Sequence, residues 1–114
     1  MWLPNTIVLP LAFALTIRIF INDRFEWDPL KAAANWRGHG VTFQQAAKAV
    51  SDPFAIEWID DREAYDEERI NLLGMCAGMI LHVTYTERGD RIRIISARRA
   101  ERDEQDDYYR ENSR

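Results

Sequence analysis

The sequence contains little that would support a disulfide-stabilised or zinc-dependent protein. Among its 114 residues there is one cysteine, Cys76, so no intramolecular disulfide can form. The two histidines, His39 and His82, are widely separated and have no zinc-ligand spacing to each other or to the cysteine. We therefore expect a cytoplasmic chain, because a reducing compartment suits an unpaired cysteine, and we expect it to need no metal or other cofactor.

The sequence also lacks the large basic excess of proteins that bind DNA through bulk charge, because its formal net charge is −4. The charges are unevenly distributed, however. Six arginines lie between Tyr85 and Arg102, whereas the segment 60–69 (DDREAYDEER) holds six acidic residues and two arginines. This pattern indicates a defined anion site, for which the forked guanidinium is well suited, and a possible basic partner.

A long apolar run occurs only at the beginning of the chain, over residues 6–21 (TIVLPLAFALTIRIFI). It is short for a membrane span, Pro10 and Arg18 interrupt it, and no basic residue precedes it as in a signal peptide. Three interpretations are open: a weak membrane anchor or uncleaved signal, an extra strand, or a segment translated from an upstream start codon. We favour the last, and expect residues 1–22 to lie outside a single domain of residues 23–114 that has no membrane partner.

Local signals divide the remaining chain into helices and strands. Asp28-Pro29 is typical of a helix start, and Gly38-His39-Gly40 of its end. Thr42 and Gln45 have capping-box spacing for a second helix, which Asp52-Pro53 ends. Strands are predicted over 54–59, 69–76, 79–86 and 91–96, and a helix from Ala97. The expected fold is α+β, with two N-terminal helices on an antiparallel three- to four-stranded sheet and a C-terminal helix.

The last predicted hairpin carries the candidate site. In RIRII, residues 91–95, arginine and isoleucine alternate, which places the guanidiniums on one face of a strand. A four-residue loop over 87–90 would set Thr86 opposite Arg91 and Thr84 opposite Arg93, on one face with His82. Such a face has the groups of a metal-free ribonuclease, because RNA supplies its own 2′-hydroxyl nucleophile. The alternative is an ordinary solvated sheet face, on which His82 is a surface residue rather than a catalyst.

Several blocks together resemble the BrnT family, the ribonuclease toxins of bacterial type II toxin–antitoxin systems. They are FEWDP (25–29), Lys31, Asn35, HGVTF (39–43), DDREAYDEER (60–69) and RIRIISARRA (91–100). The resemblance implies a RelE-like fold, an endoribonuclease that cleaves mRNA, and neutralisation by a BrnA-like ribbon-helix-helix antitoxin, through which alone operator DNA would be bound. Family members usually carry an aliphatic residue in place of His82, often carry a basic one in place of Gly38, and begin just before FEWDP.

The resemblance and the arginine pattern together give a set of expected site residues. Phosphate binding and stabilisation are assigned to Arg88, Arg93 and Arg98. The candidates for proton transfer, in falling order of preference, are His39, Glu68 and Tyr65. Further contacts to RNA are expected from Lys31, Arg62, Arg69, Arg91 and Arg99. The alternatives are a non-catalytic binding module that acts as a corepressor with a DNA-binding partner, and a membrane-anchored protein that uses residues 6–21.

Overall fold

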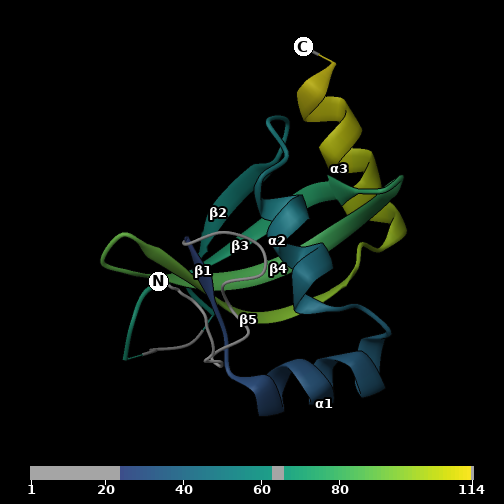
Figure 1. The fold of residues 1–114 in the computed structure, drawn as a ribbon. Coiled ribbons are helices and arrows are strands. Elements are labelled where there is room, and N and C mark those ends of the chain that lie inside the picture. Colours follow the sequence, from purple (N-terminus) through teal and green to yellow (C-terminus); the bar gives the residue numbers. More distant parts are fainter. Residues whose placement is uncertain (1–23, 63–65, 114) are drawn as a thin grey trace, which may run out of the picture.

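The computed structural model describes residues 24–62 and 66–113 (Figure 1). The predicted apolar extension, residues 1–22, therefore lies outside the described part of the chain. No helix in the described ranges is long and apolar enough to cross a membrane.

The described residues form three helices and a five-stranded mixed sheet of strand order β1-β5-β4-β3-β2. The elements are β1 (Phe25–Glu26), α1 (Pro29–His39), α2 (Phe43–Val50), β2 (Ile56–Asp60), β3 (Arg69–Cys76), β4 (Met79–Arg88), β5 (Arg91–Arg99) and α3 (Arg102–Asn112). Figure 1 shows α2 in front of the sheet, α1 along its lower edge and α3 at the upper right. The α+β class predicted from the sequence is confirmed.

The two helices after β1 begin and end where their capping residues predict. Asp28 accepts a hydrogen bond of 2.8 Å from the backbone N–H of Leu30, and α1 ends at Gly40, whose φ of 67° is left-handed. At α2, the Thr42 hydroxyl accepts from the N–H of Gln45, and the Gln45 side chain accepts from the N–H of Thr42. These contacts lie within one helical turn, so sequence spacing suffices to predict them.

The sheet differs from the prediction in its number of strands and in one pairing direction. It has five strands rather than three or four, and β1 pairs in parallel with β5. The strand β1 also precedes the two helices, so the helices are not the first elements. With two residues, β1 is too short to show a period of two in the sequence. Its position depends on a partner strand near the other end of the chain.

The last hairpin also differs, in its turn and in its register. Its loop is the two-residue turn Gly89-Asp90, because Arg88 pairs with Arg91, and Gly89 supplies a φ of 62°. Thr86 consequently faces Arg93 rather than Arg91, and the expected four-residue loop is wrong. The strand β5 extends to Arg99 and α3 begins at Arg102, so the segment from Ala97 is a strand where a helix was predicted.

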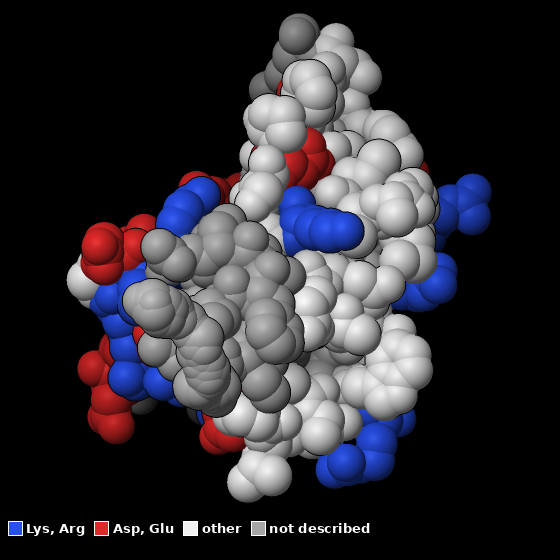
Figure 2. Space-filling model, viewed as in Figure 1, with Lys and Arg blue, Asp and Glu red and all other residues white. Residues whose placement is uncertain are grey.

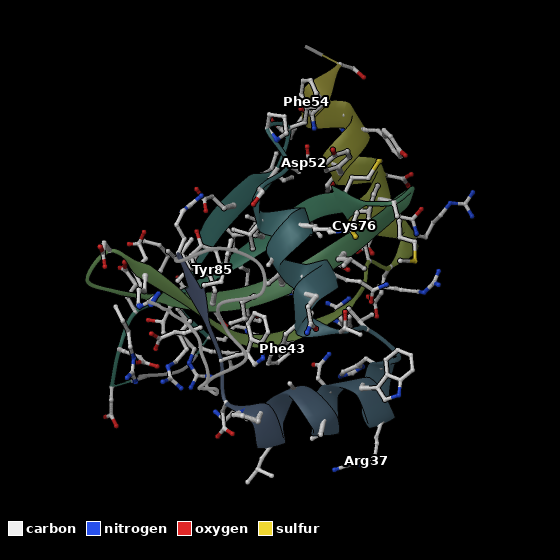
Figure 3. All side chains as sticks on the ribbon, in the orientation of Figure 1. Arg37, Phe43, Asp52, Phe54, Cys76 and Tyr85 are labelled. Atoms are coloured by element: carbon white, nitrogen blue, oxygen red, sulfur yellow. The ribbon has the colours of Figure 1, made fainter. Side chains whose placement is uncertain are left out.

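The main core lies between the sheet and the pair α1 and α2. Figure 3 shows Phe43 between α2 and the sheet, and this side chain is fully buried together with Phe25, Leu81, Val83 and Ile94. At Gly74 the backbones of α2 and β3 approach so closely that a Cβ atom would lie 2.1 Å from the carbonyl oxygen of Ala49. Glycine is therefore required at this position, and helix-to-sheet packing there has no space for a side chain.

The edge of β5 is covered by a side chain of α1. The amide of Asn35 donates to the carbonyl of Ala97 at 2.8 Å and accepts from its N–H at 3.0 Å, as a neighbouring strand would. A further donation, to the carbonyl of Val41, fixes the turn between α1 and α2. Asn35 is buried, so these three bonds are made away from water.

Candidate functional site

We call the side of the sheet opposite α1 and α2 the open face; α3 covers one end of it. The strand register places the following side chains there: Glu26, Trp58, Arg69, Asn71, His82, Thr84, Thr86, Arg91, Arg93, Ser96 and Arg98. Most of these are charged or carry a hydroxyl or an amide, whereas the residues of the same strands on the other face form the apolar core. At the end covered by α3, the open face also carries Ile56, Leu73, Met75 and Ile80, which pack with Tyr108. The open face is thus the polar side of a two-sided sheet.

A β-bulge in β5 decides which arginines share this face. Tyr85 pairs with Ile94 but Thr84 pairs with Ser96, so Ile95 is an extra residue on β5. Without it, a period of two would place Arg98 on the side opposite to Arg93. The bulge therefore brings Arg93 and Arg98, which are five positions apart, to the same face. The predicted grouping of Thr84, Thr86 and His82 with the strand arginines is found, through a register different from the expected one.

Two of the arginines are held by the carboxylate of Glu26. The Arg93 Nε lies 3.0 Å from Oε2 of Glu26, and the Arg91 Nε lies 3.7 Å from Oε1. Glu26 is the direct neighbour of Arg93 across the parallel β1–β5 pair. Both arginine side chains remain about one third exposed, so Glu26 fixes their position without burying them.

The third arginine belongs to a compact cluster at the α3 end of the open face. The guanidinium of Arg98 makes a bidentate pair with Glu104 of α3, at 2.8 and 3.0 Å. Glu104 also accepts from the N–H of Glu101, which caps α3. Burial alone would raise the pKa of Glu104, but the bonds from Arg98 and Glu101 outweigh it and lower that pKa. The Arg98–Glu104 pair therefore stays charged and anchors the beginning of α3 to β5.

His82 lies beside this pair, directly across from Arg98 in the β4–β5 register. Its Nε2 is 3.9 Å from Oε2 of Glu104, and its ring meets the ring of Trp58 edge to face at 5.8 Å. Burial, followed by the charge of Arg98, lowers the pKa of His82, against the opposing effect of Glu104. A neutral imidazole is consequently favoured at neutral pH.

The acidic segment between β2 and β3 borders the hairpin end of the open face. Asp60 binds Arg62 bidentately at 2.8 and 2.9 Å, and Arg88 lies 3.6 Å from Glu67. The backbone carbonyl of Glu68 accepts from the hydroxyl of Thr86, the residue that faces Arg93. Arg69, the first residue of β3, lies next to Thr86, one position beyond the Ile70–Tyr85 pair. Of the expected proton-transfer residues, Glu68 thus has its backbone at the edge of the open face, whereas Tyr65 lies outside the described residues.

Other expected residues are placed elsewhere. Lys31 and His39 are exposed on α1, which packs on the opposite side of the sheet, so the structure does not bring them to the arginines. Arg99 is exposed at the end of β5 and pairs with Leu81. In Figure 2, the described surface on the side of α1 and α2 shows lysine and arginine scattered, with acidic side chains beside them at the left.

No three His, Cys, Asp or Glu side chains in residues 24–62 and 66–113 lie close enough together to hold a metal ion.

Three residues of the site were missed by sequence reasoning: Glu26, Glu104 and Trp58. Glu26 is 67 positions from Arg93, and no sequence spacing connects the two. Glu104 is only six positions from Arg98, but the pair joins a strand to a helix, so neither helical nor strand periodicity predicts it. Trp58 had one available signal, because a tryptophan on a short strand beside an acidic loop has few apolar neighbours to bury it. It is 42% exposed.

The fold and the site define a small α+β protein with an arginine-bearing, hydroxyl-lined sheet face suited to anions. A family model described as "Ribonuclease toxin, BrnT, of type II toxin-antitoxin system" matches residues 27–104, from just before α1 into α3. The chain belongs to this family of ribonuclease toxins, which confirms the resemblance found in its sequence. A comparison with curated proteins found no match.

Proposed function

We propose that this chain is an endoribonuclease that cleaves mRNA on its open face by metal-independent general acid–base catalysis. The observation that carries the proposal is the bulge at Ile95, which aligns Arg93 and Arg98 on one face beside the hydroxyls of Thr84, Thr86 and Ser96. Two arginine side chains on one sheet face, each about one third exposed, are suited to an RNA phosphate. The family membership supports the same activity.

The reaction needs few protein groups. The ribose 2′-hydroxyl attacks the adjacent phosphorus while a base takes its proton, and the bond to the 5′-oxygen breaks as that oxygen receives a proton. Arginine guanidiniums stabilise the charge that develops on the phosphoryl oxygens, and such a contact is worth about 3 kcal/mol in the transition state. Glu26 holds Arg93 and Glu104 holds Arg98 in position on the open face.

Among the residues considered for proton transfer, Glu68 has the position that best supports a role. The backbone of Glu68 is bonded to Thr86, opposite Arg93, whereas His39 lies at the end of α1, away from the open face. A carboxylate near the phosphate suits the general base. The phosphate contacts proposed from Arg88, Arg93 and Arg98 are then complemented by Arg62, Arg69 and Arg91 at the same face.

The partner follows from the family. A type II toxin is paired with a protein antitoxin, and we propose a BrnA-like ribbon-helix-helix protein that also makes all contacts to operator DNA. We further propose that the toxin acts in the cytoplasm and that the antitoxin covers the arginines of its open face. Formation of the complex should then protect Arg93 and Arg98 from an arginine-directed reagent; full reactivity in the complex would move the inhibitory contact elsewhere.

Cleavage of a defined single-stranded RNA by the purified chain in EDTA tests the proposal. The products should end in a 2′,3′-cyclic phosphate or 3′-phosphate, and induction of the chain alone in bacteria should arrest growth with loss of intact mRNA. Activity that disappears in EDTA and returns with magnesium would contradict the metal-independent mechanism and point to the acidic segment instead.

One observation favours the non-catalytic alternative, a corepressor that binds without chemistry. Both Nη groups of Arg98 donate to Glu104, and such a pair must open or share its donors before phosphate binds. Intact RNA and normal growth at full expression of the folded chain would support this second function.

A further inference from the structure

A groove of about 470 Å³ lies between β2 and α3, at the end of the open face. Its lining consists of Ile56, Glu57, Trp58, Leu73, Asp107, Arg110 and Glu111. The floor is apolar and the α3 side is charged. The proposed phosphate chemistry uses none of these residues, so the groove is a separate feature of the same side of the molecule.

Trp58 is the large aromatic side chain of this groove, and it is oriented rather than loose. It is 42% exposed, and its contact with His82, at 5.8 Å and 72°, supports one part of the ring while the rest faces solvent. His82 in turn faces Arg98 across the β4–β5 pair. A short chain of contacts therefore links the indole to the proposed phosphate site.

The α3 side of the groove has a charge pattern that disfavours phosphate and favours hydrogen-bond donors. Asp107 and Glu111 lie one helical turn apart, and Arg110 binds Asp107 at 2.8 Å. Glu57 also borders the groove, but its carboxylate is directed to the other face of the sheet, where it accepts from the hydroxyl of Tyr85. A phosphate would be repelled here, whereas an uncharged base with N–H groups would find acceptors.

We propose that this groove binds an unpaired nucleobase of the RNA substrate, stacked on Trp58, with guanine preferred. Guanine presents N1–H and an N2 amino group side by side on its Watson–Crick edge, and a carboxylate of Asp107 or Glu111 can accept both. Uracil has a single N–H donor on that edge and two carbonyl oxygens, which the carboxylates repel. Single-stranded RNA is read through such splayed, stacked bases. The inference rests on the proposed ribonuclease function and assigns it a substrate-positioning site.

The geometry gives each part of the nucleotide its own environment. The base enters the groove between Trp58 and α3, and the backbone stays on the side of His82 and Arg98, where the guanidinium lies. The alternative is that Trp58 is an ordinary surface residue, which only covers the apolar floor made by Ile56 and Leu73. That explanation predicts no dependence of RNA affinity on the indole.

The test uses hexanucleotides with every 2′-hydroxyl methylated, one all-uracil and one with a single guanine, so that binding is measured without cleavage. Fluorescence anisotropy should show that Trp58→Ala weakens binding of the guanine probe by at least about tenfold, the loss expected for a removed stacking platform. Trp58→Phe should retain most of the affinity. Trp36→Ala is the matched control, because Trp36 is 55% exposed on α1, away from the open face. This substitution should leave binding unchanged.

The guanine preference has its own variants. Replacing Asp107 and Glu111 together by alanine should remove the preference for the guanine probe while leaving affinity for the all-uracil probe unchanged or higher. Thermal unfolding of each variant checks that α3 is still folded.

Equal affinity of Trp58→Ala and wild type for the guanine probe overturns the inference, as does a wild-type chain that binds neither probe. In the first case the groove becomes a candidate for protein docking. Failure of the ribonuclease proposal is distinguishable, because a chain that cleaves no RNA can still bind the methylated guanine probe through Trp58.

Discussion

The two faces of the sheet are built from the same strands but obey different rules. On the face under α1 and α2, alternate residues of β4 such as Leu81, Val83 and Tyr85 are buried in one apolar core. On the open face, the intervening residues make polar contacts with partners from distant parts of the chain. Packing on the face under α1 and α2, the closed face, depends on the shape and volume of its side chains. The arrangement of the open face depends on which charged groups are neighbours. Damage to the first should therefore lower stability, and damage to the second should lower function.

The largest expected effect is on the closed side, at Asn35. Asn35→Ala removes three buried hydrogen bonds and leaves the N–H and C=O of Ala97 without the side chain that pairs them. The free energy of unfolding should fall by about 4 kcal/mol, since each unsatisfied buried group costs about 1–3 kcal/mol. Urea denaturation measures the loss. Arg37→Ala, an exposed change on the same helix (Figure 3), should alter stability by less than about 0.5 kcal/mol.

A second change tests the close packing of α2 on β3. In Gly74→Ala the new Cβ would overlap the carbonyl oxygen of Ala49, so the backbones must separate. We expect a loss of about 3 kcal/mol in the free energy of unfolding. Gly38→Ala is the matched control: nothing lies within 4 Å of its Cβ position, and it should stabilise α1 by about 0.5 kcal/mol. Equal stabilities of the two variants would contradict the tight approach.

On the open face, Arg93→Ala should cost function rather than stability. RNA cleavage should fall by about a hundredfold, because a donor to the developing phosphate charge is lost. Stability should change little, since Glu26 retains Arg91 as a neighbour. Arg93→Lys keeps the positive charge but removes the planar guanidinium, so it should recover part of the cleavage rate lost in Arg93→Ala. A folded Arg93→Ala variant with full activity would remove the phosphate role from this side chain.

The smallest effect concerns Asp52, which joins α3 to the rest of the domain. Its carboxylate accepts from the Tyr108 hydroxyl at 2.6 Å and from the N–H groups of Phe54 and Met75 (Figure 3). Burial raises the pKa of Asp52, but these three bonds outweigh it and hold the pKa below its usual value. Burial and Asp52 raise the pKa of Tyr108 to about 12, so the phenol remains a donor at neutral pH.

Asp52→Asn should therefore lower the free energy of unfolding by about 2 kcal/mol at neutral pH. A depressed folded-state pKa gives a contribution that is present above the unfolded value, about 4, and is lost as pH falls through the folded value. The difference between wild type and variant should accordingly shrink below about pH 4. A difference that stays constant down to about pH 2 would show that the charge on Asp52 is not what stabilises the α3 contact.

The sequence alone determined the parts whose contacts are local. Asp28, Gly40 and the Thr42–Gln45 pair placed both ends of α1 and the start of α2, because a cap bonds within a few residues of itself. The alternation around Arg91 and Arg93 showed that one face of the last strand would be cationic. The family was also recognisable from its blocks of residues, because their order and spacing along the chain are properties of the sequence itself.

Only the tertiary structure decided the register and the charge partners. The bulge at Ile95 depends on how β5 fits β4, and it alone places Arg98 on the same face as Arg93. Glu26 and Arg93 are 67 positions apart, and the two-residue strand that joins them carries no periodic signal. The groove beside Trp58 exists because α3 packs across the end of the sheet. Such features arise from long-range pairing, in which one extra residue reverses the face of every side chain that follows, and the local pattern contains no record of that choice.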